Sequence, residues 1–188
     1  MENRQSRLET KVQVLDEAAV KRALMRISYE IVEKCADVSN LVLVGIRTRG
    51  VPIAEMIAEN IRKNSGETVP VGSLDITFYR DDLEKIDESP KLSDTKIAAD
   101  INGKEVVLVD DVLYTGRTAR AAIDALFALG RPGKIRLAVL VDRGHRELPI
   151  RPDYVGKNIP TALSEVIKVH IDATDGKTGV DICKVVQE

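Results

Sequence analysis

Two adjacent carboxylates, Asp110 and Asp111, come just before a turn that is rich in hydroxyl groups and glycine. They follow the apolar run 106–109, which is typical of a strand covered on both faces of a parallel sheet. The turn over 115–118 reads Thr-Gly-Arg-Thr and leads into a helical pattern. Backbone N–H groups, two hydroxyls and the positive end of a helix form a cradle for a monophosphate. This order of residue types predicts a ribose 5-phosphate site, with the paired acids at the sugar hydroxyls.

An acid pair that merely caps a strand end, followed by an ordinary turn, would use the same residue types. We favour the phosphate site because an apolar strand, paired acids, the pattern T-G-x-T and a helix occur in that order. In open α/β sheets, ligands bind beyond the carboxyl ends of the strands, which is where this segment is expected. The segment matches neither a Walker P-loop nor the G-x-G-x-x-G pattern of dinucleotide sites.

The rest of the chain alternates between strand-like and helix-like patterns. Asp16 is a good N-cap, and apolar residues follow it at helical spacing at positions 20, 24, 27 and 31. Two more helices are expected, one through Ile53, Ile57 and Ile61 and one that begins near Thr118. Strands are expected over 41–45, 71–79, 106–109, 137–141, 166–171 and 180–186, and a loop over 144–161. The alternation predicts an α/β fold with a mainly parallel sheet flanked by helices.

We expect a single domain over residues 14–188, preceded by a polar extension over 1–13. The stretch 80–100 is rich in acidic residues and serine, so it is too polar for a core and too long for a tight turn. Loops of this length inside a compact domain are usually functional lids or disordered segments. A mobile lid over a site is the favoured interpretation, and a solvated excursion is the alternative.

Composition excludes several classes of protein. With 188 residues, 31% of them charged, and a formal net charge of −2, the chain is neither an acidic tail nor a polycation. No window approaches the roughly 18 consecutive apolar residues of a membrane span, and the polar N-terminus lacks the apolar segment of a signal peptide. Cys35 and Cys183 have no metal-ligand spacing, so reduced thiols in a cytoplasmic protein are expected.

Several segments taken together resemble a known family. The run 106–118 is similar to the signature with which type I phosphoribosyltransferases bind 5-phosphoribosyl 1-diphosphate. The segments 45–50 and 74–83 stand where that family has its diphosphate loop and its flexible catalytic loop, and 142–151 and 155–161 complete the set. In combination they closely resemble the bacterial pyrimidine-operon attenuation regulators that are also uracil phosphoribosyltransferases.

The resemblance implies the type I phosphoribosyltransferase fold, with a flexible lid over about 80–100 and a small hood over about 142–188. It implies transfer of a phosphoribosyl group from 5-phosphoribosyl 1-diphosphate to uracil, giving UMP and diphosphate. Mg²⁺ is the implied cofactor, held mainly through substrate and water, with Asp110 and Asp111 as candidate protein ligands. A homodimer or a higher homo-oligomer is implied as well.

The same resemblance implies roles for individual residues. Catalysis is expected of Asp110, Asp111 and the lid residue Arg80. The 5-phosphate is expected at Thr115, Gly116, Arg117 and Thr118, and the diphosphate at Arg47, Thr48 and Arg49. The uracil ring is expected against a hood that includes Asp142, Arg143, Asn158 and Ile159.

Tyr114 departs from the purine-salvage relatives of this family, which often have an aspartate at this position of the signature. Such an acid lies close to the base nitrogen that reacts, whereas a tyrosine is a poor general base at neutral pH. The residue favours a pyrimidine acceptor. A purine (hypoxanthine/guanine) phosphoribosyltransferase without RNA binding is the alternative.

Basic residues gather in the first expected helix and in the stretch 143–157. On charge alone, two solvated faces would be the plainer interpretation. The resemblance instead implies a face that binds a hairpin in the leader mRNA of a pyrimidine operon, with UMP as both product and co-effector. The best candidates by position are Arg26, Arg146, Arg151 and Lys157. Met25 and Tyr29 stand where polar residues are expected, so we expect RNA affinity or target sequence to differ here.

Overall fold

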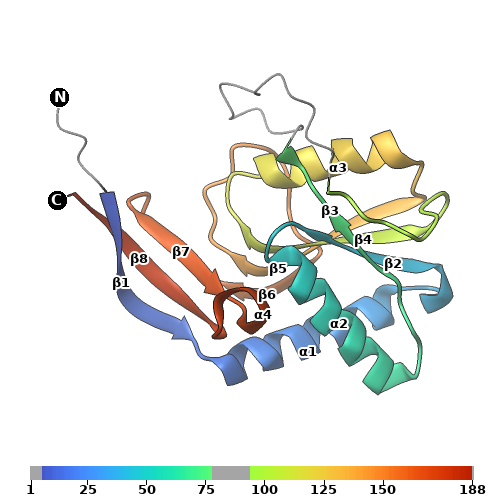
Figure 1. The fold of residues 1–188 in the computed structure, drawn as a ribbon, viewed down its shortest axis with the longest axis horizontal. Coiled ribbons are helices and arrows are strands. Elements are labelled where there is room, and N and C mark those ends of the chain that lie inside the picture. The colour runs from blue at the N-terminus through green and yellow to red at the C-terminus, as the bar shows by residue number, and fades with distance from the viewer. Residues whose placement is uncertain (1–5, 78–93, 188) are drawn as a thin grey trace.

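Figure 1 shows a computed structural model of the chain, which describes residues 6–77 and 94–187. The strands are β1 (Ser6–Leu15), β2 (Leu41–Ile46), β3 (Val71–Leu74), β4 (Glu105–Leu113), β5 (Lys134–Asp142), β6 (Tyr154–Asn158), β7 (Glu165–His170) and β8 (Gly179–Gln187). The helices are α1 (Glu17–Lys34), α2 (Gly50–Ser65), α3 (Arg117–Leu129) and the short α4 (Asp172–Asp175), with a 3-10 turn over Val38–Asn40. The described strands form a larger parallel sheet and a smaller antiparallel one.

The larger sheet has the strand order β3-β2-β4-β5-β6. From β2 the chain passes through α2 to β3 on one side, and from β4 it passes through α3 to β5 on the other. The strand order therefore reverses between β2 and β4. Such a reversal leaves a crevice beyond the carboxyl ends of the two strands, where ligands bind in open α/β sheets. The predicted α/β fold with a mainly parallel sheet is confirmed.

Helices cover both faces of the larger sheet. Leu41 and Leu43 of β2 belong to a core that they share with α1 and α2. Val42 and Val44, which alternate with them, pack in a second core with α3. Burial on both faces explains why these strands are almost uniformly apolar in sequence. The Asp16 carboxylate caps α1 as predicted, by accepting a hydrogen bond from a backbone N–H of the first turn at 2.7 Å.

The smaller sheet has the order β1-β8-β7, and its strands are antiparallel. Figure 1 shows it with α4 to one side of the larger sheet. β7 and β8 confirm the two strands expected near the C-terminus. The N-terminal segment differs from the prediction of a polar extension over 1–13, because residues 6–13 belong to β1 and pair with β8. Leu8 and Val12 stand among polar residues, so the average polarity of the segment hides its strand character, and residues 7–13 are all exposed in the structure.

Three further segments differ from the sequence prediction. The strand expected over 71–79 ends at Leu74. β6 lies within 144–161, which was predicted as a loop. This edge strand has only five residues and, among the described strands, pairs only with β5. A strand this short leaves little hydrophobic pattern in the sequence. Lys96, within the expected lid 80–100, exchanges two backbone hydrogen bonds with Ser73 at 2.8 and 2.9 Å. The end of that segment is therefore tied to β3.

Candidate active site

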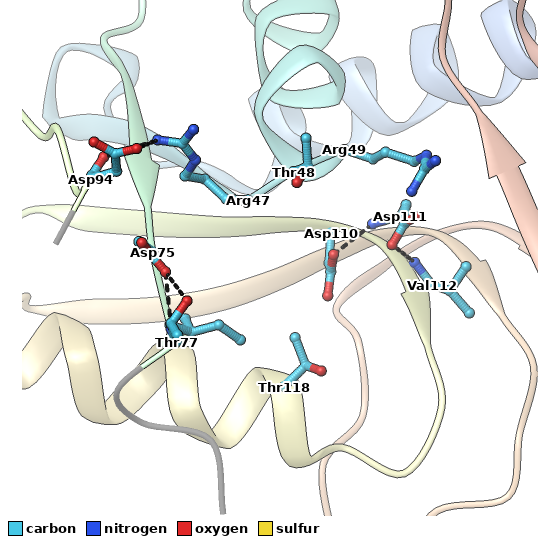
Figure 2. A pocket seen from close by; sticks show the side chains of 11 residues that line it. Arg47, Thr48, Arg49, Asp75, Thr77, Asp94, Asp110, Asp111, Val112 and Thr118 are labelled. Atoms are coloured by element: carbon cyan, nitrogen blue, oxygen red, sulfur yellow. Dashed lines mark hydrogen bonds and ion pairs between the residues drawn. The ribbon is translucent and has the colours of Figure 1, made fainter. Parts of the chain in front are cut away.

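Asp110 and Asp111 lie near the end of β4, beyond the point where β2 stops pairing with it. β4 pairs with β2 only as far as Val109, but it pairs with β5 as far as Leu113. A cavity of about 450 Å³ lies at this opening, and both carboxylates line it (Figure 2). The reversal of strand order thus places the paired acids in an open crevice, as their position in the sequence predicted.

The cavity brings together residues that are far apart in the chain. Its lining includes the predicted diphosphate residues, the acid pair and one residue of the predicted phosphate turn: Arg47, Thr48, Arg49, Asp110, Asp111 and Thr118. Asp75, Thr77 and Asp94 also line it; they belong to the segments 74–83 and 80–100, which the sequence marks as catalytic loop and lid, but no individual role was predicted for them. Asp75 and Thr77 follow β3, so they emerge at the same carboxyl edge of the sheet. The rule that ligands bind at that edge is the signal that would have found them.

The loop 47–49 is held against β4 by close backbone packing. A β-carbon on Gly50 would collide with the carbonyl oxygen of Val109, and one on Gly45 would lie 2.6 Å from the backbone of Gly50. Glycine at these positions lets the start of α2 approach both central strands of the sheet. The packing brings the predicted diphosphate loop beside the acid pair.

The predicted phosphate turn has the backbone conformation that its sequence suggests. Gly116 has a φ of 94°, a left-handed conformation that glycine adopts without strain, and it is the N-cap of α3. The Thr115 hydroxyl accepts a hydrogen bond from the Arg117 N–H at 3.3 Å. Thr118, in the first turn of α3, lines the cavity. The Arg117 Nε donates to Glu147 at 2.8 Å. Thr115, Gly116 and Arg117 are not among the residues that line the cavity, and a 5-phosphate contact by the turn stays a prediction.

The acid pair is held by the backbone that follows it. The Asp111 N–H donates to Asp110 Oδ1 at 2.9 Å, and the Val112 N–H donates to Asp111 Oδ1 at 2.8 Å. Burial raises the pKa of Asp110 well above its usual range, and the neighbouring charge of Asp111 raises it further. The site therefore holds the Asp110 carboxylate in an environment that disfavours its charge until a cation or a hydrogen-bonding ligand arrives.

The charges that line the cavity do not balance. Among the residues that the structure describes, four carboxylates line it, from the acid pair and from Asp75 and Asp94, against two guanidinium groups. Both arginines are already paired, Arg47 with Asp94 at 3.0 Å and Arg49 with Asp175 at 2.7 Å. The described part of the lining therefore favours a polyanionic ligand that arrives together with a divalent cation. The hard oxygen donors suit Mg²⁺, which binds through one or two carboxylates together with phosphate oxygens and water.

The four residues expected in the base-binding hood lie where β5 and β6 end. The Ile159 N–H donates to the Asp142 carbonyl oxygen at 2.8 Å, and Asn158 pairs with Asp142 at the end of the two strands. Asp142, Arg143, Asn158 and Ile159 are therefore brought together as predicted. Among the described residues, they are not part of the lining of the 450 Å³ cavity.

The Arg143 side chain is buried and forms hydrogen bonds within the hood. It is only 6% exposed, and its Nε donates to the Thr161 hydroxyl at 3.1 Å and its Nη2 to the Glu165 carbonyl oxygen at 2.8 Å. Its guanidinium also lies 4.0 Å from the ring centre of Tyr114. Tyr114, which the sequence marked as a departure from the purine enzymes, therefore packs against the hood.

Comparison with known proteins identifies the family. Residues 12–174 match the phosphoribosyl transferase domain family. The chain is 58% identical over 175 residues to the bifunctional protein PyrR of Clostridium perfringens, across 93% of this chain and 98% of that one. It is 57% identical over 172 residues to the bifunctional protein PyrR of Thermus thermophilus, across 92% of this chain and 95% of that one. The chain belongs to the PyrR family.

Solved structures confirm the fold expected of a PyrR chain. A hypoxanthine-guanine phosphoribosyltransferase from Bacillus anthracis superposes with a TM-score of 0.66 at 18% identity, covering 96% of this chain and 100% of that one. A hypoxanthine phosphoribosyltransferase from Trypanosoma cruzi superposes with a TM-score of 0.70 at 19% identity, covering 94% and 96%. At such identity the likeness shows the type I phosphoribosyltransferase fold alone. The PyrR relatives favour the regulator-type enzyme over the purine alternative.

Arg146, a predicted RNA contact of this PyrR chain, is bound within the protein. Its Nη2 donates to Asp142 Oδ2 at 2.6 Å. Its Nε and Nη1 donate to the carbonyl oxygens of Ile150 and Tyr114 at 2.9 and 2.8 Å. The guanidinium thus ties the loop after β5 to the end of β4. This structural role was not visible in the sequence, and an RNA contact by Arg146 stays a prediction.

The other RNA candidates lie on or close to β6. Arg26 of α1 donates from Nη2 to the carbonyl oxygens of Val155 and Gly156 at 2.9 and 2.7 Å. Arg26 and Lys157 line a second cavity of about 480 Å³, between α1 and β6. Arg151 and Lys157 are exposed. The structure therefore brings Arg26 and Lys157 to one surface although they are far apart in the chain.

Arg80, the predicted catalytic residue of the lid, lies outside the described residues. In residues 6–77 and 94–187, no cluster of three or more His, Cys, Asp or Glu side chains could hold a metal ion. In the same part of the chain, no helix has the length and apolar character needed to cross a membrane.

Proposed function

We propose that this chain transfers the phosphoribosyl group of 5-phosphoribosyl 1-diphosphate to uracil, and that it regulates transcription attenuation of a pyrimidine operon by binding leader RNA in response to UMP. The transfer rests on the cavity in which Asp110 and Asp111 meet Thr118 and the loop 47–49 (Figure 2). Membership of the PyrR family supports both activities, because the relatives are named bifunctional. The proposed location of the protein is the cytoplasm, where nascent RNA and the sugar donor occur.

Each part of the donor has a matching group in the proposal. The 5-phosphate accepts hydrogen bonds from the N–H groups and hydroxyls of the turn 115–118. The helix dipole of α3 favours negative charge at this position. The ribose hydroxyls donate to Asp110 and Asp111. The diphosphate binds at the loop 47–49, where Thr48 and Arg49 donate hydrogen bonds to it.

The reaction makes one bond and breaks one bond. Uracil N1 bonds to the anomeric carbon while the bond from that carbon to the diphosphate oxygen breaks, and its electron pair leaves with the diphosphate. The N1 proton passes to solvent. Positive charge that develops on the ribose ring is stabilised by the nearby acid pair, and negative charge on the leaving diphosphate is stabilised by Arg49. Positioning the two reactants side by side in one site supplies the remaining acceleration.

Mg²⁺ is the cofactor in this proposal, because the four carboxylates of the lining would otherwise repel the donor. Asp110 and Asp111 would hold it, together with donor oxygens and water. When bound, Mg²⁺ would supply charge neutralisation on the diphosphate. It would also favour the charged form of Asp110, whose pKa is raised by burial and by Asp111.

The RNA part of the proposal rests on the surface around β6. Arg26, Arg151 and Lys157 would bind phosphates of the hairpin. Lys157 directly precedes Asn158 of the hood within β6, and Ile159 of the hood follows the end of that strand. A base held by the hood and an RNA held by β6 therefore share one element, which gives UMP a route to bias RNA affinity. The proposed assembly is a homodimer or higher homo-oligomer.

An assay with two acceptors tests the enzyme. The protein, 5-phosphoribosyl 1-diphosphate and Mg²⁺ are incubated with uracil or with hypoxanthine, and the nucleoside monophosphate formed is quantified. We expect UMP from uracil and no product from hypoxanthine. Product from hypoxanthine alone would establish the purine alternative.

A titration tests the regulator. A leader hairpin of a pyrimidine operon is titrated with protein in the presence and absence of UMP, with a hairpin of scrambled loop sequence as control. We expect tighter binding with UMP and weak binding to the control. Equal binding of both hairpins, unaffected by UMP, would leave a protein that has the enzyme site without the regulatory activity.

A further inference from the structure

Arg49 of the diphosphate loop forms a bidentate ion pair with a carboxylate from a distant part of the chain. Its Nε donates to Asp175 Oδ2 at 3.0 Å and its Nη2 donates to Asp175 Oδ1 at 2.7 Å. The two residues are 126 positions apart. Asp175 is the last residue of α4, and its Oδ2 also accepts from the Ile171 N–H at 3.0 Å. The carboxylate is therefore fixed by its own backbone before it holds the arginine.

This pair is more sheltered than most ion pairs on the surface. The side chains of Arg49 and Asp175 are 31% and 16% exposed. The hydrogen bonds from Arg49 lower the pKa of Asp175 to about 2. The same contact is the main cause that raises the pKa of Arg49, and the charge of Asp111 adds to it. Arg49 thus interacts with the charges of both Asp175 and Asp111, and Arg49 and Asp175 both stay charged at neutral pH.

The bidentate contact leaves three N–H donors of the Arg49 guanidinium for a ligand. Arginine has five N–H donors in one rigid plane. Asp175 takes the Nε–H and one Nη2–H, so both Nη1 donors and one Nη2 donor remain. Arg49 lines the cavity, and Figure 2 shows its guanidinium on the side of Asp111. Holding one edge of the plane sets the direction in which the remaining donors point.

We propose that Asp175 is a positioning residue for phosphoribosyl transfer, which orients Arg49 so that its remaining N–H donors meet the leaving diphosphate. The inference rests on the proposed transfer. Donors that are already oriented stabilise developing charge without reorganising during the reaction. Because Asp175 belongs to the C-terminal segment, the contact also couples the α4 region to the diphosphate loop.

The main variant is Asp175→Asn, which keeps the size of the side chain and an acceptor for the Ile171 N–H but loses the charge that holds Arg49. We expect the KM for 5-phosphoribosyl 1-diphosphate to rise and kcat to fall, together by about 10- to 100-fold, as for groups that orient a ligand-binding side chain. The KM for uracil should not change. Asp175→Glu, which keeps the charge, should recover part of the loss.

The matched control is Glu59→Gln on α2. Glu59 accepts from Nε and Nη2 of Arg62, both at 2.8 Å, and this pairing likewise lowers its pKa to about 2. The pair lies outside the 450 Å³ cavity. Glu59→Gln should therefore leave both KM values and kcat unchanged, although it removes the same kind of contact.

A double-mutant cycle with Arg49→Ala shows whether Asp175 acts through Arg49. In the Arg49→Ala background, Asp175→Asn should have no further effect on donor KM. Binding of inorganic diphosphate in Mg²⁺ buffer, measured by calorimetry, provides a readout without turnover and should weaken in Asp175→Asn. Wild-type kinetics in Asp175→Asn, or equal losses in both backgrounds, would overturn the positioning role. A wild-type protein that binds diphosphate but transfers nothing to uracil would refute the proposed function and not the role of Asp175.

Discussion

The carbonyl oxygen of Val109 occupies the place where a β-carbon on Gly50 would stand. The first residue of α2 therefore touches the backbone of β4, one residue before Asp110. Because both sides of the contact are backbone, no side-chain movement can relieve a larger residue at position 50. Together with the close approach at Gly45, this contact brings the diphosphate loop beside the acid pair.

Gly50→Ala should therefore disturb both stability and the site. We expect a loss of about 1–3 kcal/mol in the free energy of unfolding, as for other overpacked positions, and a higher KM for 5-phosphoribosyl 1-diphosphate. Urea unfolding and steady-state kinetics provide the two measurements. Glu55→Ala, at an exposed position of the same helix, is the control and should change neither. A Gly50→Ala protein with wild-type stability would show that α2 can shift away from β4 at little cost.

Asp110→Asn should stabilise the ligand-free protein at neutral pH. The folded pKa of Asp110 is raised by burial and by Asp111, whereas an unfolded aspartate titrates near 3.9. Above about pH 4 the folded state thus binds more protons than the unfolded state, so this group weakens folding as the pH rises through that window. The asparagine removes that cost and keeps an acceptor for the Asp111 N–H.

Thermal unfolding of both proteins in EDTA, at pH 7 and at pH 4, measures this effect. We expect the Tm of Asp110→Asn to exceed that of the wild type at pH 7 by about 2–4 °C, which corresponds to about 1 kcal/mol at this chain length. At pH 4 the difference should be much smaller. Turnover should be strongly reduced in the same variant. A lower Tm at pH 7 would mean that the Asp110 charge stabilises the ligand-free fold.

Arg146→Ala should act on the fold. The substitution removes donors from Asp142 and from the carbonyl oxygen of Tyr114, and it leaves a sheltered carboxylate without its partner. We expect a loss of about 2–4 kcal/mol in the free energy of unfolding. Arg151→Ala, at an exposed position nearby, should cost no more than about 0.5 kcal/mol. Similar unfolding curves for the two variants would contradict the structural role of Arg146.

Arg151→Ala and Lys157→Ala should act on RNA binding instead. If each residue neutralises a phosphate, each variant should weaken hairpin binding and reduce the slope of log affinity against log salt by about one. Titrations at several salt concentrations, with UMP present, provide the slopes. Uracil phosphoribosyltransferase activity should remain, because neither residue lines the 450 Å³ cavity. Unchanged affinities and slopes would make this basic surface an ordinary solvated face.

The parallel sheet and the site formed by the acid pair and the phosphate turn could be predicted from the order of residues alone. Strands buried on both faces must be apolar throughout, so the runs around 41–45, 106–109 and 137–141 mark the sheet directly. The phosphate turn is equally local, because its glycine, hydroxyls and helix N-terminus are consecutive residues. Features made by neighbours along the chain leave a pattern that can be read without the fold.

The contacts between side chains that are far apart in the chain could not be predicted in this way, because they depend on how the segments pack. Asp75 lines the cavity because it follows β3 at the carboxyl edge of the sheet, and Asp94 lines it and pairs with Arg47, 47 positions earlier in the chain. Two arginines show the same dependence on packing. Arg146 forms an ion pair with Asp142 of the hood, and Arg49 pairs with a carboxylate 126 positions away. A long charged side chain can reach many partners, so its role depends on the packing of segments and not on its place in the chain.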